Sequence, residues 1–128
     1  MDAETGEVTA LTSGNWDLYS YYPTPDGSKV AALISTPTDI GDLFLIDGHS
    51  GRLDQVTRIN SELFAKLDLT PPEMIWYKSF DGRPVQAWVQ RPPDFEAGRK
   101  YPLILDIHGG PHAAYGYTFD GCGSHPGH

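Results

Sequence analysis

The feature that most constrains the fold is the apolar run at residues 103–107, which His108, Gly109, Gly110 and Pro111 follow at once. A nearly continuous apolar run is typical of a strand buried on both faces, as in the parallel sheet of an α/β domain. Two glycines just beyond such a strand let the backbone pass close to a ligand with its N–H groups exposed. In hydrolases, N–H groups placed in this way form an oxyanion hole. The segment therefore points to hydrolase chemistry.

The chain before this run is divided into short apolar stretches by turns rich in glycine and proline. With 11 prolines and 14 glycines in 128 residues, it suits short strands better than long helices. Four strands in about 44 residues also match the period of one β-propeller blade. Val56 and Ile59 are expected to be apolar anchors of the last strand, and Gly41 to lie in a loop before the third. The four strands are expected at residues 16–22, 29–35, 43–46 and 53–59.

A second set of elements is expected after the fourth strand. Asn60 and Ser61 predict the start of a short helix reaching Leu67. The double proline at residues 71–72 marks a boundary, because it stops the preceding element and stiffens the connection. Beyond it we expect a hairpin with strands at 74–80 and 84–90, followed by the inner strand at 103–107. This order is typical of the beginning of an α/β-hydrolase domain.

Composition and charge exclude several classes of partner. The formal net charge of −8 argues against nucleic acid or an anionic membrane. No apolar stretch approaches the roughly 18 residues of a membrane span, and the N-terminus lacks the features of a signal peptide. A single cysteine, Cys122, fits a reducing compartment. We therefore expect a cytoplasmic protein with no nucleic-acid or membrane partner.

Three segments resemble the prolyl oligopeptidase family of serine peptidases, in particular its acylaminoacyl-peptidase and dipeptidyl-peptidase-like branch. Residues 22–31 resemble the strand and turn of that family's propeller blades, and residues 73–88 resemble the entry hairpin of its hydrolase domain. Residues 100–112, followed by Tyr115 and Tyr117, carry the most specific likeness. The resemblance implies a propeller of about seven or eight blades over an α/β-hydrolase domain, with the active site between them.

The expected fold is therefore mostly β with some α/β character. Residues 1–70 are expected to form the C-terminal part of a β-propeller, about one blade plus a short helix. Residues 71–119 are expected to form the N-terminal part of a truncated α/β-hydrolase domain. Residues 120–128 are glycine-rich and contain no helix pattern, which is typical of a disordered or foreign tail.

The resemblance assigns the backbone N–H of Gly110 to the oxyanion hole, with Gly109 shaping the turn and His108 supporting it. Asp106 and His108 are not a catalytic pair, because residues two apart on one strand share a face but cannot span a triad. The family's nucleophile elbow, acid and base would lie downstream, and the family-like sequence stops at about Phe119. We expect the 128-residue chain by itself to be inactive.

Other candidate sites have structural explanations. Residues 48–52 begin like a nucleophile elbow, but they end in Arg52 and lie between two strands, so a surface turn is expected. The aromatic residues at 16–22 are expected to pack in the sheet, and Arg83 and Arg91 to be solvated. Zinc-ligand types occur near the C-terminus, but a glycine-rich tail provides no scaffold for a metal. These weak candidates are Cys122, His125 and His128, with His112 able to complete the set.

The sequence therefore predicts a fragment of a serine peptidase that hydrolyses short peptides by acyl transfer and needs no cofactor. Two alternatives stay open. A carboxylesterase carries a similar His-Gly-Gly-Gly turn, and a non-catalytic β-rich interaction module would also fit the strands. The expected partners are a peptide substrate in the full-length protein and a second copy of the chain, because unpaired strand edges favour self-association.

Overall fold

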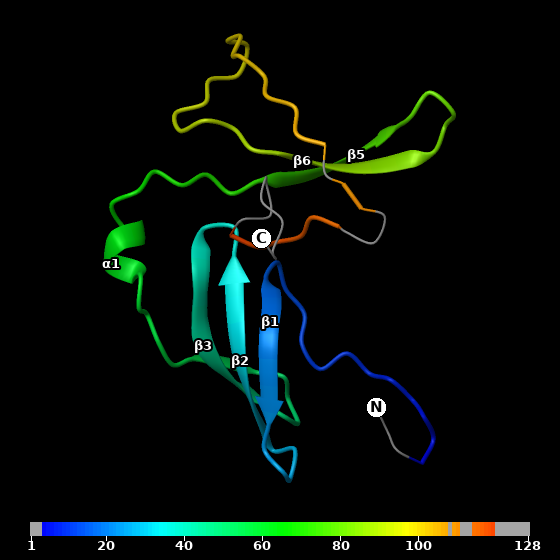
Figure 1. The fold of residues 1–128 in the computed structure, drawn as a ribbon, viewed down its shortest axis with the longest axis vertical. Coiled ribbons are helices and arrows are strands. Elements are labelled where there is room, and N and C mark those ends of the chain that lie inside the picture. Colours follow the sequence, from blue (N-terminus) through cyan, green and yellow to red (C-terminus); the bar gives the residue numbers. More distant parts are fainter. Residues whose placement is uncertain (1–3, 108, 111–113, 120–128) are drawn as a thin grey trace.

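The fold is mostly β, as predicted, and consists of two antiparallel sheets with one short helix in the part of the chain that the structure describes (Figure 1). The computed structural model describes residues 4–107, 109–110 and 114–119. The first sheet has the order β1-β2-β3-β4, and the second is a hairpin. The elements are β1 (Asp17–Pro23), β2 (Lys29–Thr36), β3 (Asp39–Asp47), β4 (Leu53–Gln55), α1 (Ser61–Phe64), β5 (Glu73–Lys78) and β6 (Pro84–Val89).

The four-stranded sheet has a small apolar core on one face. Its buried members are Ala32, Ile34 and Ile46. Ala32 and Ile34 come from alternate positions of β2, and side chains two apart on a strand share a face. Ile46 reaches the same face from β3, where it lies opposite Val30. Half-buried side chains complete this cluster: Trp16, Leu18, Val30, Phe44 and Leu53.

The first two strands lie within one residue of their predicted ends, but the third differs. β3 begins at Asp39, and Thr36 already pairs with Asp39 across a tight turn. The loop predicted through Gly41 is therefore wrong. Gly41 lies inside the strand with a φ of 131°, and its N–H donates to the carboxylate of Asp39 at 3.0 Å. Glycine adopts this backbone conformation at no steric cost, so it continues the strand.

The fourth strand is shorter than predicted, and a buried carboxylate binds the residues around its end. Asp42 is 3% exposed. Its Oδ1 accepts hydrogen bonds from the Thr57 hydroxyl at 2.6 Å and from the Ile59 N–H at 3.1 Å, and its Oδ2 accepts from Gln55 at 3.1 Å. The Thr57 hydroxyl in turn accepts the N–H of Leu43 at 2.9 Å. The regular ladder ends at Gln55, and beyond it the N–H groups of Val56 and Thr57 both donate to the Leu43 carbonyl, at 2.8 and 3.3 Å.

The apolar anchors predicted for the fourth strand are also wrong. Val56 and Ile59 are both exposed, because they follow the last ladder residue, Gln55. The backbone at Ile59 is held to the sheet through its N–H and Asp42. This segment is attached by polar groups instead of apolar packing.

Hydrogen bonding sets the ionisation of Asp42. Burial by itself raises the pKa of a carboxyl group. At Asp42, hydrogen bonds from Thr57, Ile59 and Gln55, together with the positive charge of Arg58, outweigh burial and hold the pKa below its ordinary value. A carboxyl with a lowered pKa in the folded state stabilises the fold at pH values above its unfolded pKa. This contribution is lost as the pH falls through the folded pKa.

The helix is shorter than predicted. α1 ends at Phe64, and hydrogen-bonded turns continue only as far as Leu67. The side chain of Asn60 makes no capping hydrogen bond. Leu63 and Leu67 are exposed, so the helix has little apolar packing. A single turn gains little from packing, and starting a helix is costly.

The second sheet is a hairpin whose turn matches the prediction. The N–H of Gly82 donates to the Ser79 carbonyl at 2.9 Å, and Gly82 has a φ of 83°. Val85 and Ala87 of β6 are half-buried and alternate with the exposed residues Pro84 and Gln86. Trp88 departs from the alternation and is also half-buried, because its ring meets another aromatic ring outside the sheet.

The strand predicted at residues 103–107 is absent. These residues have no assigned strand, and Leu103, Ile104, Leu105 and Ile107 are between 75% and 92% exposed. A parallel strand buried on both faces needs strands beside it and layers over it. Among the described residues, both sheets are antiparallel and neither accepts this segment. The prediction of a buried inner strand is therefore wrong for this chain.

Residues 120–128, for which a disordered or foreign tail is predicted, lie outside the described residues. Among the helices that the structure describes, none is long and apolar enough to cross a bilayer.

Replacing the buried carboxylate tests its role in the first sheet. We expect Asp42→Asn to lower the free energy of unfolding by about 1–3 kcal/mol, because an amide nitrogen would face donors that need an acceptor. Urea unfolding followed by tryptophan fluorescence measures the change.

Ser35→Ala is the matched control for this variant. Ser35 is fully buried in the same sheet, and its hydroxyl has no hydrogen-bond partner among the described residues. Removing the Ser35 hydroxyl should leave the free energy of unfolding unchanged or slightly higher. Equal losses in the two variants would contradict the role assigned to Asp42.

Candidate functional site

The two glycines predicted to shape an oxyanion turn lie on the surface. Gly109 and Gly110 are exposed, and a Cβ placed on Gly109 would meet no atom within 4 Å. The residues predicted to support the turn or follow it, His108 and Pro111, lie outside the described residues. Oxyanion donors work best in a site that excludes water. The structure therefore leaves the glycine pair accessible and does not enclose it.

Two aromatic contacts hold the chain that follows the glycines. The rings of Trp88 and Tyr117 meet edge to face with their centroids 4.8 Å apart, and the rings of Phe64 and Phe119 lie 5.2 Å apart. Figure 1 shows this last described segment, in orange and red, passing between the four-stranded sheet and the β5–β6 hairpin. Aromatic pairs at these distances are each worth about 0.5–1.5 kcal/mol beyond area burial. They tie residues 114–119 to both parts of the chain.

The loop after β6 is organised around stacked arginine and aromatic side chains. The Arg91 guanidinium lies 5.2 Å from the centre of the Phe95 ring, and the Phe95 ring lies 5.3 Å from that of Tyr101. Arg99 covers Tyr101 at 5.4 Å. Arg91 also forms an ion pair with Glu73 at 2.8 Å. Cation–π contacts at exposed sites contribute about 0.5–1 kcal/mol each. Together these contacts stabilise the folded conformation of the loop.

Sequence reasoning missed this loop cluster. Arginine and aromatic residues recur between two proline-containing segments, and that spacing was the available signal. Arg91 and Arg83 are both exposed, as predicted, but each has a carboxylate partner. Arg83 pairs with Asp81 at 3.4 Å. Neither arginine is directed at the glycine pair by any contact that the structure shows.

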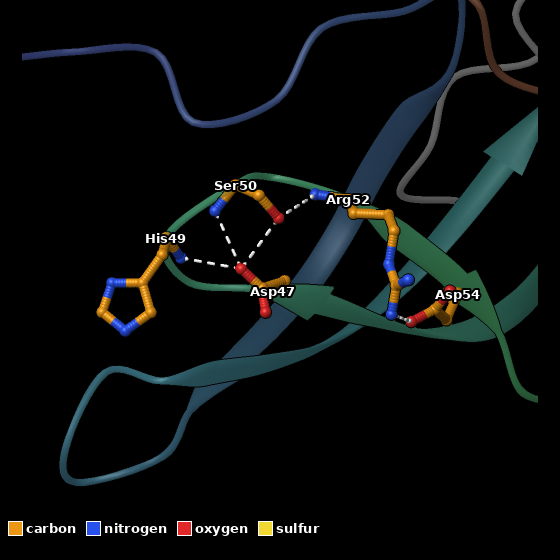
Figure 2. Close-up of polar contacts among 5 residues, drawn as sticks. All are labelled: Asp47, His49, Ser50, Arg52 and Asp54. Carbon is orange, nitrogen blue, oxygen red and sulfur yellow. Dashed lines mark hydrogen bonds and ion pairs between the residues drawn. The ribbon is translucent and has the colours of Figure 1, made fainter.

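The segment that resembles a nucleophile elbow is a surface turn between β3 and β4, as predicted. Figure 2 shows Oδ1 of Asp47 accepting hydrogen bonds from the His49 N–H at 3.1 Å and from both the N–H and the hydroxyl of Ser50 at 2.8 Å. The His49 ring points away from Ser50 (Figure 2). The Ser50 hydroxyl donates a hydrogen bond to the Asp47 carboxylate, so it is not arranged as a nucleophile beside a histidine base.

The same turn depends on a glycine. Gly51 has a φ of 71°, and a Cβ there would lie 1.9 Å from the carbonyl oxygen of Leu11. Arg52 forms an exposed ion pair with Asp54 at 2.7 Å (Figure 2). Exposed pairs contribute little to stability. The backbone and Asp47, more than the ion pair, shape this turn.

A second carboxylate organises the turn between β1 and β2. Oδ1 of Asp26 accepts from the Thr24 hydroxyl at 2.6 Å, from the Ser28 hydroxyl at 2.9 Å and from the Ser28 N–H at 3.1 Å. The two turns lie together, because the Gly48 N–H donates to the Ser28 carbonyl at 2.9 Å. The Thr24 and Ser28 hydrogen bonds lower the pKa of Asp26 to about 2.

Asp47 has the same electrostatic character. The N–H and hydroxyl of Ser50, followed by the N–H of His49, lower its pKa to about 2. Hydrogen bonds to the charged form favour that form. Both carboxylates therefore favour the folded state above their unfolded pKa of about 4 and lose that effect as the pH falls toward 2. Asp26 and Asp47 therefore stabilise the two turns by accepting hydrogen bonds within them.

The weak metal candidates Cys122, His125 and His128 lie outside the described residues, as does His112. Among the residues that the structure does describe, no group of three or more His, Cys, Asp or Glu side chains is placed to hold a metal ion.

Comparison with known proteins identifies the class. No family model matches the chain. It is 36% identical over 101 residues to the uncharacterized peptidase YuxL of Bacillus subtilis, and the aligned residues cover 78% of this chain and 15% of that protein. It is 32% identical over 108 residues to dipeptidyl-peptidase 5 of Porphyromonas gingivalis, covering 84% of this chain and 16% of that protein. The human dipeptidyl peptidase 8 is 41% identical over 44 residues, which are 34% of this chain and 5% of that protein.

The class is thus that of peptidases, since YuxL and dipeptidyl-peptidase 5 match most of the chain. Within that class, the resemblance to the prolyl oligopeptidase family is confirmed, and the chain is homologous to a segment of that family's peptidases. It spans about 15–16% of the length of these two relatives.

A titration tests the description of the two turns. We expect Ser50→Ala to raise the pKa of Asp47 from about 2 toward its ordinary value, because the variant removes the hydroxyl donor. Carboxyl-carbon chemical shifts followed by NMR between pH 1.5 and about 6 would measure this.

Asp26 serves as the internal control in the same sample. Its donors Thr24 and Ser28 are untouched, so its pKa should stay at about 2. An unchanged Asp47, or equal shifts at both carboxylates, would show that the Ser50 hydroxyl does not set this ionisation.

Proposed function

We propose that this chain is a segment of a serine peptidase that hydrolyses short peptides by acyl transfer. The observation that carries the proposal is the similarity to YuxL and to dipeptidyl-peptidase 5 over 78% and 84% of the chain. The names of these relatives also favour a peptidase over the carboxylesterase and over the non-catalytic β-rich module.

In this proposal, residues 1–70 belong to a β-propeller and residues 71–119 begin an α/β-hydrolase domain. The up-and-down order β1-β2-β3-β4 supports the first assignment, because propeller blades are four-stranded antiparallel sheets. The separate β5–β6 hairpin after the double proline supports the second. In the longer protein, neighbouring strands would cover the apolar residues 103–107 that are exposed here.

The proposed catalytic contribution of this segment is a backbone donor. The N–H of Gly110 would donate to the oxyanion that forms when a serine attacks the peptide carbonyl. Gly109 lets the turn approach the substrate, and His108 supports the turn. The exposure of both glycines is compatible with a close approach by substrate.

The remaining catalytic groups would come from residues outside this sequence. A Ser-His-Asp triad supplies the nucleophile, the base and the group that orients the base. The nucleophile elbow would follow Phe119 by roughly 70 to 90 residues, as the family resemblance and the elbow motif suggest. This acyl-transfer chemistry requires no metal or organic cofactor.

The role of Gly110 can be tested in the longer protein. We expect Gly110→Pro to lower kcat about 10²- to 10³-fold on a dipeptide p-nitroanilide, because proline has no N–H to stabilise the oxyanion. Gly110→Ala keeps the donor and is the matched control. Equal losses in both variants, or a proline variant that keeps its kcat, would contradict the donor role.

A further inference from the structure

Three Asp-Gly pairs lie at turns of the described chain, at residues 26–27, 47–48 and 81–82. In such a pair the glycine nitrogen can attack Cγ of the aspartate, because glycine has no Cβ to block a close approach. The attack forms a C–N bond, releases water and closes a succinimide ring. A water molecule then opens the ring at either carbonyl and leaves aspartate or isoaspartate. Water is the only co-reactant in this sequence.

Hydrogen bonds hold two of these aspartates as carboxylates, and the carboxyl group reacts in its neutral form, from which oxygen leaves as water. Oδ1 of Asp26 accepts from the Thr24 hydroxyl and from the Ser28 hydroxyl and N–H at 2.6–3.1 Å. Oδ1 of Asp47 accepts from three donors of its own turn at 2.8–3.1 Å (Figure 2). The pKa of each is lowered to about 2, which reduces the neutral fraction at pH 6 about 50- to 100-fold relative to an ordinary aspartate.

Asp81 is held much less firmly. Its Oδ1 accepts from the Arg83 N–H at 3.2 Å, and its Oδ2 lies 3.4 Å from Nε of Arg83. Among the described residues, no hydroxyl group donates to it. The Arg83 side chain is 84% exposed, and an ion pair this exposed contributes little. The Asp81 carboxyl is therefore free to turn toward the nitrogen of Gly82.

The backbone of the three turns does not distinguish them. The N–H groups of Gly27, Gly48 and Gly82 each donate to a backbone carbonyl at 2.9 Å. Gly82 has open space around it, since a Cβ there would meet no atom within 4 Å. Figure 1 shows the tip of the β5–β6 hairpin projecting away from the four-stranded sheet. The difference between Asp81 and the other two aspartates thus lies in the side-chain hydrogen bonds.

We propose that Asp81 is a site of spontaneous isoaspartate formation, and that the hydroxyl donors of the other two turns protect Asp26 and Asp47 from it. Isoaspartate adds one carbon to the main chain before Gly82. It would weaken the pair that closes this hairpin, in which the Ser79 N–H donates to the Arg83 carbonyl at 2.9 Å. The product belongs to the substrate class of methyltransferases that esterify isoaspartyl carboxylates with S-adenosylmethionine. This chemistry belongs to the turn itself and does not depend on the proposed function.

Peptide mapping of the 128-residue chain tests the proposal after incubation at about pH 6. Trypsin cleaves after lysine and arginine but not before proline, so the three pairs fall on separate peptides, 1–29, 30–52 and 79–99. The Asp-Gly pair at residues 120–121, outside the described residues, falls on a fourth peptide. Isoaspartate is separated by chromatography and verified by methyl transfer from S-adenosylmethionine with an isoaspartyl methyltransferase. We expect it to form at Asp81 at least about tenfold faster than at Asp26 or Asp47.

Two variants and one denatured sample are the controls. Asp81→Glu gives the background for peptide 79–99, because glutamate would have to close a six-membered ring. Ser50→Ala removes a hydroxyl donor from Asp47 and should raise isoaspartate formation there about threefold or more, with Asp26 unchanged. In concentrated urea all the turn hydrogen bonds are lost, so the rates at the three aspartates should become alike.

Three results would overturn the proposal. The first is isoaspartate formation at Asp26 or Asp47 that is as fast as at Asp81 in the folded chain. The second is no isoaspartate at Asp81 above the Asp81→Glu background. The third is an advantage of Asp81 that persists undiminished in urea, which would show that the local sequence and not the folded turns sets the rates. An unchanged rate at Asp47 in Ser50→Ala would contradict the protective role of the hydroxyl donor.

Discussion

The four-stranded sheet depends on one buried carboxylate. Asp42 receives hydrogen bonds from Thr57, Gln55 and the backbone of Ile59, and so attaches the chain beyond β4 to the middle of β3. Among the described residues, the apolar core has three buried side chains, so this polar network matters more to the sheet than it would beside a larger core. Hydrogen bonds to a charged group contribute about 1.5–3 kcal/mol each, comparable with burying a large apolar side chain.

The remainder of the described chain has no equivalent anchor. The β5–β6 hairpin is held by its own ladder, by the arginine and aromatic cluster of the following loop and by the ring contact between Trp88 and Tyr117. The apolar residues 103–107 remain exposed. The structure therefore combines one sheet that has its own small core with a second part that leaves apolar surface exposed. The chain spans about 15–16% of the length of the two peptidases that match most of it.

Local signals predicted the parts of the fold that local chemistry decides. The predicted ends of β1, β2, β5 and β6 lie within about two residues of the observed ones. Asp-Gly pairs at residues 26–27 and 81–82 stand between these strands, and aspartate and glycine fix turn geometry over a few residues. The length of β4 was mispredicted, since Asp42 contacts residues 13 to 17 positions away. The signal for that network was Asp42, which stands directly before the apolar residues 43–46.

The candidate site shows the same limit. The string at residues 100–112 identified the family, which the comparisons confirm. It also suggested a buried strand at 103–107, which this chain does not form. A parallel strand is stabilised by neighbours distant in sequence, so its own residues cannot determine whether it forms. For the same reason, the glycine turn by itself cannot determine which distant groups would complete a catalytic site.

The central proposal is that Gly110 would supply an oxyanion donor to a serine that lies outside this sequence in the longer protein. Labelling with a serine-directed fluorophosphonate tests it most directly, because the reagent reacts with an activated serine. The account predicts no labelling of the 128-residue chain and labelling of the longer protein at one serine outside this sequence. Labelling of the 128-residue chain that is abolished by prior unfolding would contradict the account.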